Sequence, residues 1–167
     1  AENIAIYMIG PVITTILAFF ILKEKISFLQ IIVVIVGLIG AIIIADPNSQ
    51  SFNLAIIFPF LAALCFAFFT ISTKFLNSSD TNQTTLLFTA ITGTFLSAPF
   101  IIFFWKWPSL NATILMFCLG LLATIGHFFF IEALKVINAS FAAPFVYLTV
   151  LLAAFWGYII YNEVPNQ

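Results

Sequence analysis

The 167-residue chain is 63% hydrophobic and only 7% charged, with a formal net charge of −1 at neutral pH. Soluble domains have roughly 25% charged residues, so this chain cannot cover a water-facing surface and most of it must face lipid. The near-neutral charge gives no reason to expect binding to nucleic acid. The lipid bilayer is therefore the first partner that the composition predicts.

Six apolar stretches are each long enough to cross the bilayer core, which needs roughly 20 residues per helix. In chain order they cover residues 4–22, 28–45, 52–76, 84–105, 113–134 and 141–161. They are too long and too evenly apolar for the alternating strands of a membrane barrel, so all six are expected to be helices. The predicted fold class is all-α, a polytopic membrane helix bundle.

The lysines predict how these spans are oriented. Lys23, Lys25, Lys74 and Lys135 flank the first, third and fifth connections, whereas the second and fourth hold only Lys106. Positively charged loops stay on the cytoplasmic side. We therefore expect a multi-pass protein of the plasma membrane, which is the inner membrane in a bacterium, with the loops after spans one, three and five in the cytoplasm.

The first and last stretches are similar to each other. Each contains a proline, Pro11 or Pro144, and each ends in a glutamate at the lipid–water boundary, Glu24 or Glu163. Five spans separate the glutamates, so they emerge on opposite sides, as in an inverted-topology repeat. Prolines bend helices, and a glutamate at a helix C-terminus needs a compensating partner such as a lysine or a helix N-terminus. All four residues are therefore predicted to be gating or structural residues.

Two segments resemble the EamA-type drug/metabolite transporters. The first begins at Gly10-Pro11, continues through Lys-Glu24-Lys-Ile-Ser and closes at Gly40; the second runs from Gly126-His127 through Ala139-Ser140 to Glu163-Val-Pro165. The second segment is similar to a bacterial subgroup that includes S-adenosylmethionine uptake carriers. Val33 and Glu132 depart from the family pattern, which has a glycine and a neutral or basic residue at these positions.

The resemblance implies a carrier of ten helices in two inverted halves of five, of which this chain holds spans four to nine. Residues 1–46 are then the last two spans of the first half, residues 47–52 the connecting loop, and residues 53–167 the first four spans of the second half. Both ends of the chain are accordingly expected to continue into missing spans of the same polypeptide. A small-molecule substrate and a second copy of the chain are further candidate partners.

Small and polar residues form stripes on the first, third, fifth and sixth spans at helical spacing. The second span has no polar side chain between Gln30 and Asp46 and is interpreted as a lipid-facing or scaffold helix. Polar groups in membranes are costly and often functional, although small residues and threonines also serve close helix packing. The stripes supply the predicted substrate-binding residues: Tyr7, Thr14, Phe66, Phe69, Thr70, Thr124, His127 and Tyr147.

His127 is the most prominent of these residues. It precedes Lys135 by eight positions, which places it about 12 Å below the cytoplasmic boundary and near the midplane, where carriers bind their substrates. Tyr147 is expected at similar depth, so the two side chains are predicted to share a polar layer; a neutral histidine bonded to a neighbouring helix is the alternative. Glu132 lies about 140° around the helix from His127 and is predicted to form a surface ion pair with Lys135 instead.

The sequence contains no Gly-rich phosphate loop, no Cys/His metal spacing and no paired carboxylates within a span, so no metal site, cofactor or catalytic residue is predicted. With the family resemblance, the predicted function is transport of a small, partly apolar or cationic metabolite by alternating access. An amino acid or an S-adenosylmethionine-like compound fits this description. Two alternatives remain open: an intramembrane lipid-modifying enzyme and a non-transporting scaffold subunit.

Overall fold

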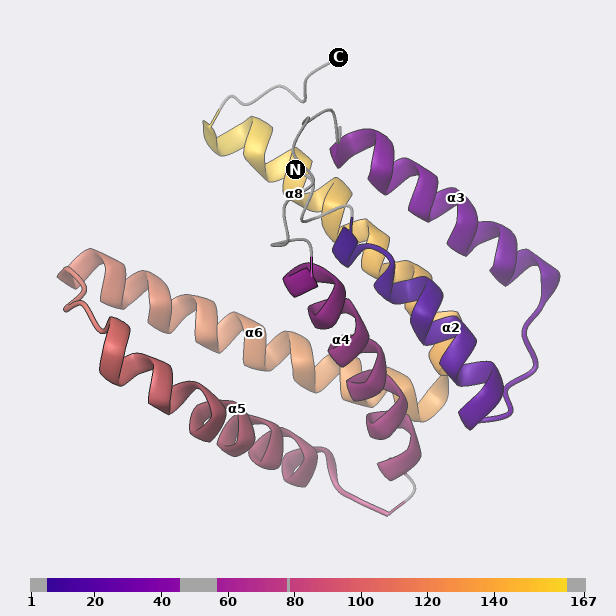
Figure 1. Ribbon diagram of the computed structural model, residues 1–167, viewed down its shortest axis with the longest axis horizontal. Helices are drawn as coiled ribbons and strands as arrows, with labels where there is room; N and C mark the ends of the chain where they lie inside the picture. Colours follow the sequence, from indigo (N-terminus) through magenta and orange to yellow (C-terminus); the bar gives the residue numbers. More distant parts are fainter. Residues whose placement is uncertain (1–5, 46–56, 78, 162–167) are drawn as a thin grey trace. The chain divides into compact units, whose positions relative to one another are not determined.

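The computed structural model describes residues 6–45, 57–77 and 79–161, and the regular elements within these ranges are helical (Figure 1). In chain order they are α2 (Gly10–Ile21), α3 (Phe28–Ala45), α4 (Ile57–Leu76), α5 (Asn82–Phe104), α6 (Leu110–Val136), α7 (Ala139–Ala142), the 3₁₀ helix η2 (Ala143–Tyr147) and α8 (Leu148–Tyr161). The chain is therefore all-α, as predicted.

Four stretches of the described chain are long and apolar enough to cross a membrane: α4, α5, α6 and the run Ala139–Ile160. Each coincides with one of the predicted spans. The first two predicted spans correspond to α2 and α3, which are apolar but shorter: Gly10–Ile21 and, within α3, Phe28–Gly40. The chain is thus a multi-pass membrane protein.

The two prolines predicted to interrupt the first and last spans have different positions. Pro11 lies in the first turn of α2, where its missing N–H leaves no bond unmade, and a turn at Met8 and Ile9 separates α2 from the helical residues Ile6 and Tyr7. Pro144 does break the last span, because the backbone from Ala143 to Tyr147 winds as a 3₁₀ helix between α7 and α8.

The C-terminus of α2 is closed by a left-handed residue. Lys23 has φ 55°, a conformation that costs a non-glycine residue roughly 1–2 kcal/mol. This turn lets the Glu24 N–H donate at 3.2 Å to the Ala18 carbonyl, which also accepts a hydrogen bond from the Leu22 N–H. It also fixes the direction in which the Glu24 side chain leaves the helix.

The chain divides into two compact units, of which the first comprises Ala1–Phe75 and Ile137–Gln167. Its helices approach each other through small residues. A Cβ added to Gly10 would be only 3.7 Å from the Cβ of Ala63, and Thr14, Ala18 and Ala67 are also buried. Close approach of this kind strengthens van der Waals packing, which drives helix association in lipid.

The second unit, Leu76–Val136, contains α5 and α6, which lie side by side as an antiparallel pair (Figure 1). The side chain of Thr81 caps the start of α5 by accepting a hydrogen bond from the Thr84 N–H at 3.3 Å. Large apolar side chains cover both helices and remain exposed, for example Phe103 and Phe117. A surface of this kind is compatible with lipid and not with water.

Candidate functional site

Tyr147, a predicted substrate-binding residue, belongs to a cluster of buried side chains in the first unit. Its side chain is only 8% exposed and packs with Met8 and Val150, against which Tyr7 and Leu38 are packed. Its hydroxyl has no hydrogen-bond partner among the described residues. Burying a hydroxyl without a partner costs roughly 1–3 kcal/mol, so this atom is a natural contact for a polar group of a ligand.

The ring of Tyr147 lies directly against the backbone of α3. A Cβ added to Gly37 would be 2.6 Å from Tyr147 Cε2 and 2.9 Å from Cγ, distances that real Cβ atoms do not adopt. Gly37 is therefore the position on α3 that makes room for the ring. The helix that the sequence predicts to be a lipid-facing or scaffold helix thus forms part of the wall beside Tyr147.

A cleft of about 380 Å³ lies between α3 and the segment that carries Tyr147. It is lined by apolar residues apart from the tyrosine itself. The lining residues are Ile32, Val33, Val36, Gly37, Pro144, Tyr147, Leu148 and Leu151. Small-molecule sites have this character, with apolar walls and few polar groups that fix orientation.

Aromatic rings from two other predicted site residues meet in the same unit. The ring centroids of Tyr7 and Phe66 are 6.2 Å apart, with an interplanar angle of 55°, a favourable tilted arrangement. Both side chains are half-buried, as is Phe69 further along α4. Since Tyr7 also packs on the cluster around Tyr147, the fold gathers Tyr7, Phe66 and Tyr147 from three separate segments.

The predicted threonines use their hydroxyls within their own helices. Thr14 Oγ1 donates to the Gly10 carbonyl at 2.9 Å, Thr70 Oγ1 to the Phe66 carbonyl at 3.0 Å, and Thr124 Oγ1 to the Gly120 carbonyl at 2.8 Å. Thr14 and Thr70 are buried and Thr124 is exposed. Each hydroxyl keeps only its acceptor capacity for a solute, which makes these three positions weaker candidates than the tyrosines.

His127 belongs to the second unit and is exposed on α6. On the same helix, a shallow depression of about 490 Å³ extends from Met116 to Ile125 and includes Thr124. Tyr147 belongs to the first unit, so the polar layer shared by His127 and Tyr147 stays a prediction. Among the described residues, no group of three histidine, cysteine or acidic side chains is close enough to hold a metal ion.

Glu24 holds the start of the segment that carries Tyr147. Its Oε1 accepts a hydrogen bond from the Ala139 N–H at 2.9 Å, and its Oε2 accepts from the Ser140 N–H at 3.0 Å and from Ser140 Oγ at 2.7 Å. The carboxylate at the end of α2 therefore has the helix N-terminus that its position requires as a partner. Negative charge is favourable at this end of a helix. Glu163 lies outside the described residues.

Lys74 contacts the same turn from α4. Its Nζ donates to the Ile137 carbonyl at 2.8 Å, two residues before Ala139. Asn138, between these two residues, occupies the N-cap position of α7 but makes no side-chain capping bond. The turn is thus held by an anion on its amides and a cation on its carbonyl. We name the contacts of Glu24 and Lys74 with residues 137–140 the clasp.

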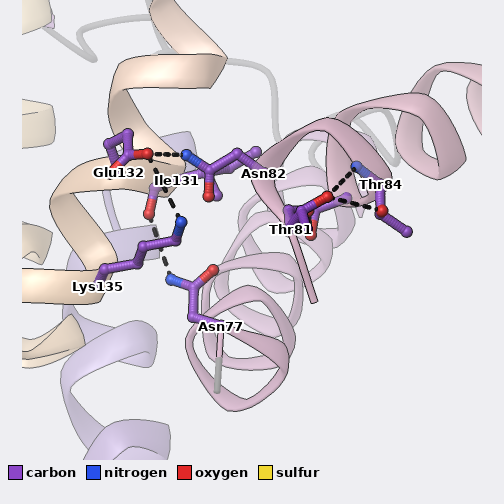
Figure 2. A network of polar contacts seen from close by, with 8 residues as sticks. Asn77, Thr81, Asn82, Thr84, Ile131, Glu132 and Lys135 are labelled. Atoms are coloured by element: carbon purple, nitrogen blue, oxygen red, sulfur yellow. Dashed lines mark hydrogen bonds and ion pairs between the residues drawn. The ribbon is translucent and has the colours of Figure 1, made fainter. Parts of the chain in front are cut away.

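Glu132 forms part of a polar network in the second unit, as Figure 2 shows. Its Oε1 is 3.6 Å from Lys135 Nζ and accepts a hydrogen bond from Asn82 Nδ2, while Asn77 Nδ2 donates to the Ile131 carbonyl at 3.2 Å. The predicted ion pair with Lys135 is confirmed. The network joins the start of α5 to the last turns of α6.

The sequence did not single out Gly37 or Lys74. A glycine in an otherwise β-branched and bulky span is a signal for close approach of another group, but that span has no polar residue to mark a site. In the sequence, Lys74 indicates only the orientation of the spans. Its partner is a backbone carbonyl, which carries no mark in a sequence.

Comparison with known proteins gives consistent matches. Residues 53–167 match the EamA-like transporter family. The chain is 33% identical to an S-adenosylmethionine uptake transporter of Rickettsia prowazekii, over 94% of this chain and 53% of the relative. It is 28% identical to a riboflavin transporter of Vibrio cholerae, over 98% of this chain and 55% of the relative. The chain therefore spans about half the length of these curated relatives. No solved structure gives a significant match.

Proposed function

The chain belongs to the EamA-like transporter family, and from this premise we propose that it is part of a carrier that moves a small metabolite across the membrane by alternating access. The proposed site lies in the first unit and consists of Tyr7, Phe66 and Tyr147. Lysine positions support an orientation with the clasp at the cytoplasmic side of the plasma membrane. Completing ten spans in two inverted halves would require further spans of the same polypeptide.

One observation carries the location of the site: the Tyr147 hydroxyl is buried and has no partner among the described residues. A buried polar atom without a partner costs free energy, so we infer that the partner of this hydroxyl comes from elsewhere. In a carrier, that partner is the solute. A transported solute must also leave again, so a single hydrogen bond is better suited than a charged pair.

The rings beside Tyr147 support a solute with a flat aromatic system. Tyr7 and Phe66 are half-buried and can stack on a heteroaromatic ring, and a tyrosine face also attracts a cation. The relatives named for S-adenosylmethionine and riboflavin have such substrates: the first has a heteroaromatic base and a sulfonium charge, and the second a heteroaromatic ring system. We therefore propose that the transported solute is a heteroaromatic metabolite, neutral or cationic, and that these residues bind it without catalysing a reaction.

The test is uptake of radiolabelled S-adenosylmethionine and, separately, riboflavin into proteoliposomes containing the full-length protein. The expected result is saturable uptake of one of them. Tyr147→Phe removes only the hydroxyl and should raise KM about 5- to 100-fold, the range for losing one buried hydrogen bond to a ligand. Tyr158→Phe is the matched control, because it removes the same hydroxyl from a tyrosine that is exposed on α8.

The outcomes separate the parts of the proposal. Saturable uptake with a raised KM for Tyr147→Phe and an unchanged KM for Tyr158→Phe supports both the function and the site. Saturable uptake that responds equally to both substitutions contradicts the site. Absence of saturable uptake of either compound contradicts the proposed solute class.

A further inference from the structure

We infer that Glu24 is a positioning residue for the candidate site: through the clasp it sets where Tyr147 lies. This inference rests on the proposed function, because it concerns the same tyrosine. Glu24 and Tyr147 are far apart in sequence, but Glu24 binds the residues that begin the segment ending in Tyr147. The aromatic residues of the candidate site do not themselves require a carboxylate at the end of α2.

The clasp supplies the groups that this helix start lacks. The first amides of a helix have no partner within the helix. Here the Ala139 and Ser140 amides bind Glu24, and the amides of Phe141 and Ala142 bind the Asn138 carbonyl at 3.1 and 3.0 Å. The Asn138 side chain does not take part in capping, so the carboxylate from α2 replaces a local cap.

The clasp also determines the register of the segment. Three hydrogen bonds to the Glu24 carboxylate, all between 2.7 and 3.0 Å, and one bond from Lys74 at 2.8 Å hold residues 137–140 from two sides. If the segment slid or rotated, its amides could not reach the Glu24 carboxylate while the Ile137 carbonyl still reached the Lys74 ammonium group. The start of the segment is therefore a fixed point with respect to α2 and α4.

From this fixed point, the 3₁₀ winding carries Tyr147 to its place. Tyr147 lies seven positions after Ser140. The rise along the helix axis between them is about 12 Å, at 2.0 Å per residue within η2 and 1.5 Å per residue before it. Tyr147 remains on the same buried face as Ser140 and Ala143. On this face its ring lies against Gly37.

The backbone around η2 favours this winding. Pro144 has no N–H to donate to the preceding turn, and Thr149 Oγ1 donates to the Val146 carbonyl at 2.6 Å. The stripe that the sequence predicts along the last span continues across η2, since Ser140, Tyr147 and Val150 are all buried. Because the segment is rigidly seated at one end, a loosened clasp should displace the tyrosine at the other.

The test is a double-mutant cycle in the full-length protein, measured as uptake of whichever labelled compound, S-adenosylmethionine or riboflavin, the parent transports. Glu24→Gln keeps the shape but removes the charge and one acceptor, and should raise KM about tenfold, as expected for weakened charge-assisted bonds. If Glu24 acts through Tyr147, then Glu24→Gln combined with Tyr147→Phe should raise KM by much less than the product of the single effects.

Glu132→Gln is the matched control, because it makes the same change at another partly exposed glutamate outside the site and should leave KM unchanged. Ser140→Ala removes one bond of the clasp without removing charge, so it tests the inference if Glu24→Gln does not fold; it should raise KM about threefold. An unchanged KM in Glu24→Gln and Ser140→Ala, or fully multiplicative effects in the cycle, would overturn the inference while leaving the proposed function intact.

A readout that needs no transport separates the two proposals further. Amide hydrogen exchange of residues 139–147 should accelerate in Glu24→Gln and stay unchanged in Glu132→Gln. If the parent transports neither compound but exchange responds in this way, the proposed solute class fails and the positioning of the segment by Glu24 stands. If exchange is the same in both variants, the positioning inference fails whatever the transport result.

Discussion

Replacing Gly37 with alanine tests whether the packing of Tyr147 on α3 is as close as the structure shows. The new Cβ would be 2.6 Å from Tyr147 Cε2 and 2.9 Å from Cγ. Cγ is the ring atom nearest the backbone, so rotating the end of the side chain cannot relieve the overlap, and the ring or α3 must move. Overpacking of this kind costs about 1–3 kcal/mol.

Gly40, one turn further along α3, provides the control. A Cβ added there meets nothing within 4 Å, so Gly40→Ala should be neutral or slightly stabilising, since alanine favours helices over glycine by up to about 1 kcal/mol. Thermal unfolding of the two variants in detergent, monitored by size-exclusion chromatography, should show that Gly37→Ala is the less stable variant. Tyr147→Leu in the Gly37→Ala background should recover the loss. Equal stability of the two alanine variants would refute the close approach of the ring to α3.

Two further predictions concern the second unit. Thr81→Ala removes the side-chain cap of α5 and should lower the free energy of unfolding by about 1 kcal/mol. Thr84→Ala should have a smaller effect, because Thr84 contributes its backbone N–H to the cap and the alanine variant retains that N–H. Thermal unfolding ranks the two variants, and a reversed order would contradict the cap. Glu132→Ala should destabilise the protein more than Lys135→Ala, because it also leaves the buried Asn82 amide unpaired. Loss of the exposed ion pair alone costs only about 0.2–1 kcal/mol. Equal losses of stability in chemical denaturation would show that the hydrogen bond from Asn82 has no energetic role.

The sequence determined the elements because a lipid environment leaves few choices. Every backbone polar group within the bilayer must be paired locally, so long apolar runs are helices wherever they occur, and the predicted range 28–45 coincides with α3 (Phe28–Ala45). Short-range chemistry was equally accessible: the Glu132–Lys135 pair follows from their spacing on one helix. The need of Glu24 for a partner followed from its place at a helix end.

The identity of that partner and the arrangement around Tyr147 were decided by tertiary structure. Helical periodicity places Tyr147 on the buried face of its segment, but it does not say which helices pack on that face. Gly37 and the Ile137 carbonyl matter only because other segments reach them, and the sequence does not say which ring packs on the glycine or which lysine binds the carbonyl. Local pairing in lipid is dictated residue by residue, whereas contacts between helices depend on how small differences in rotation and approach add up across the fold.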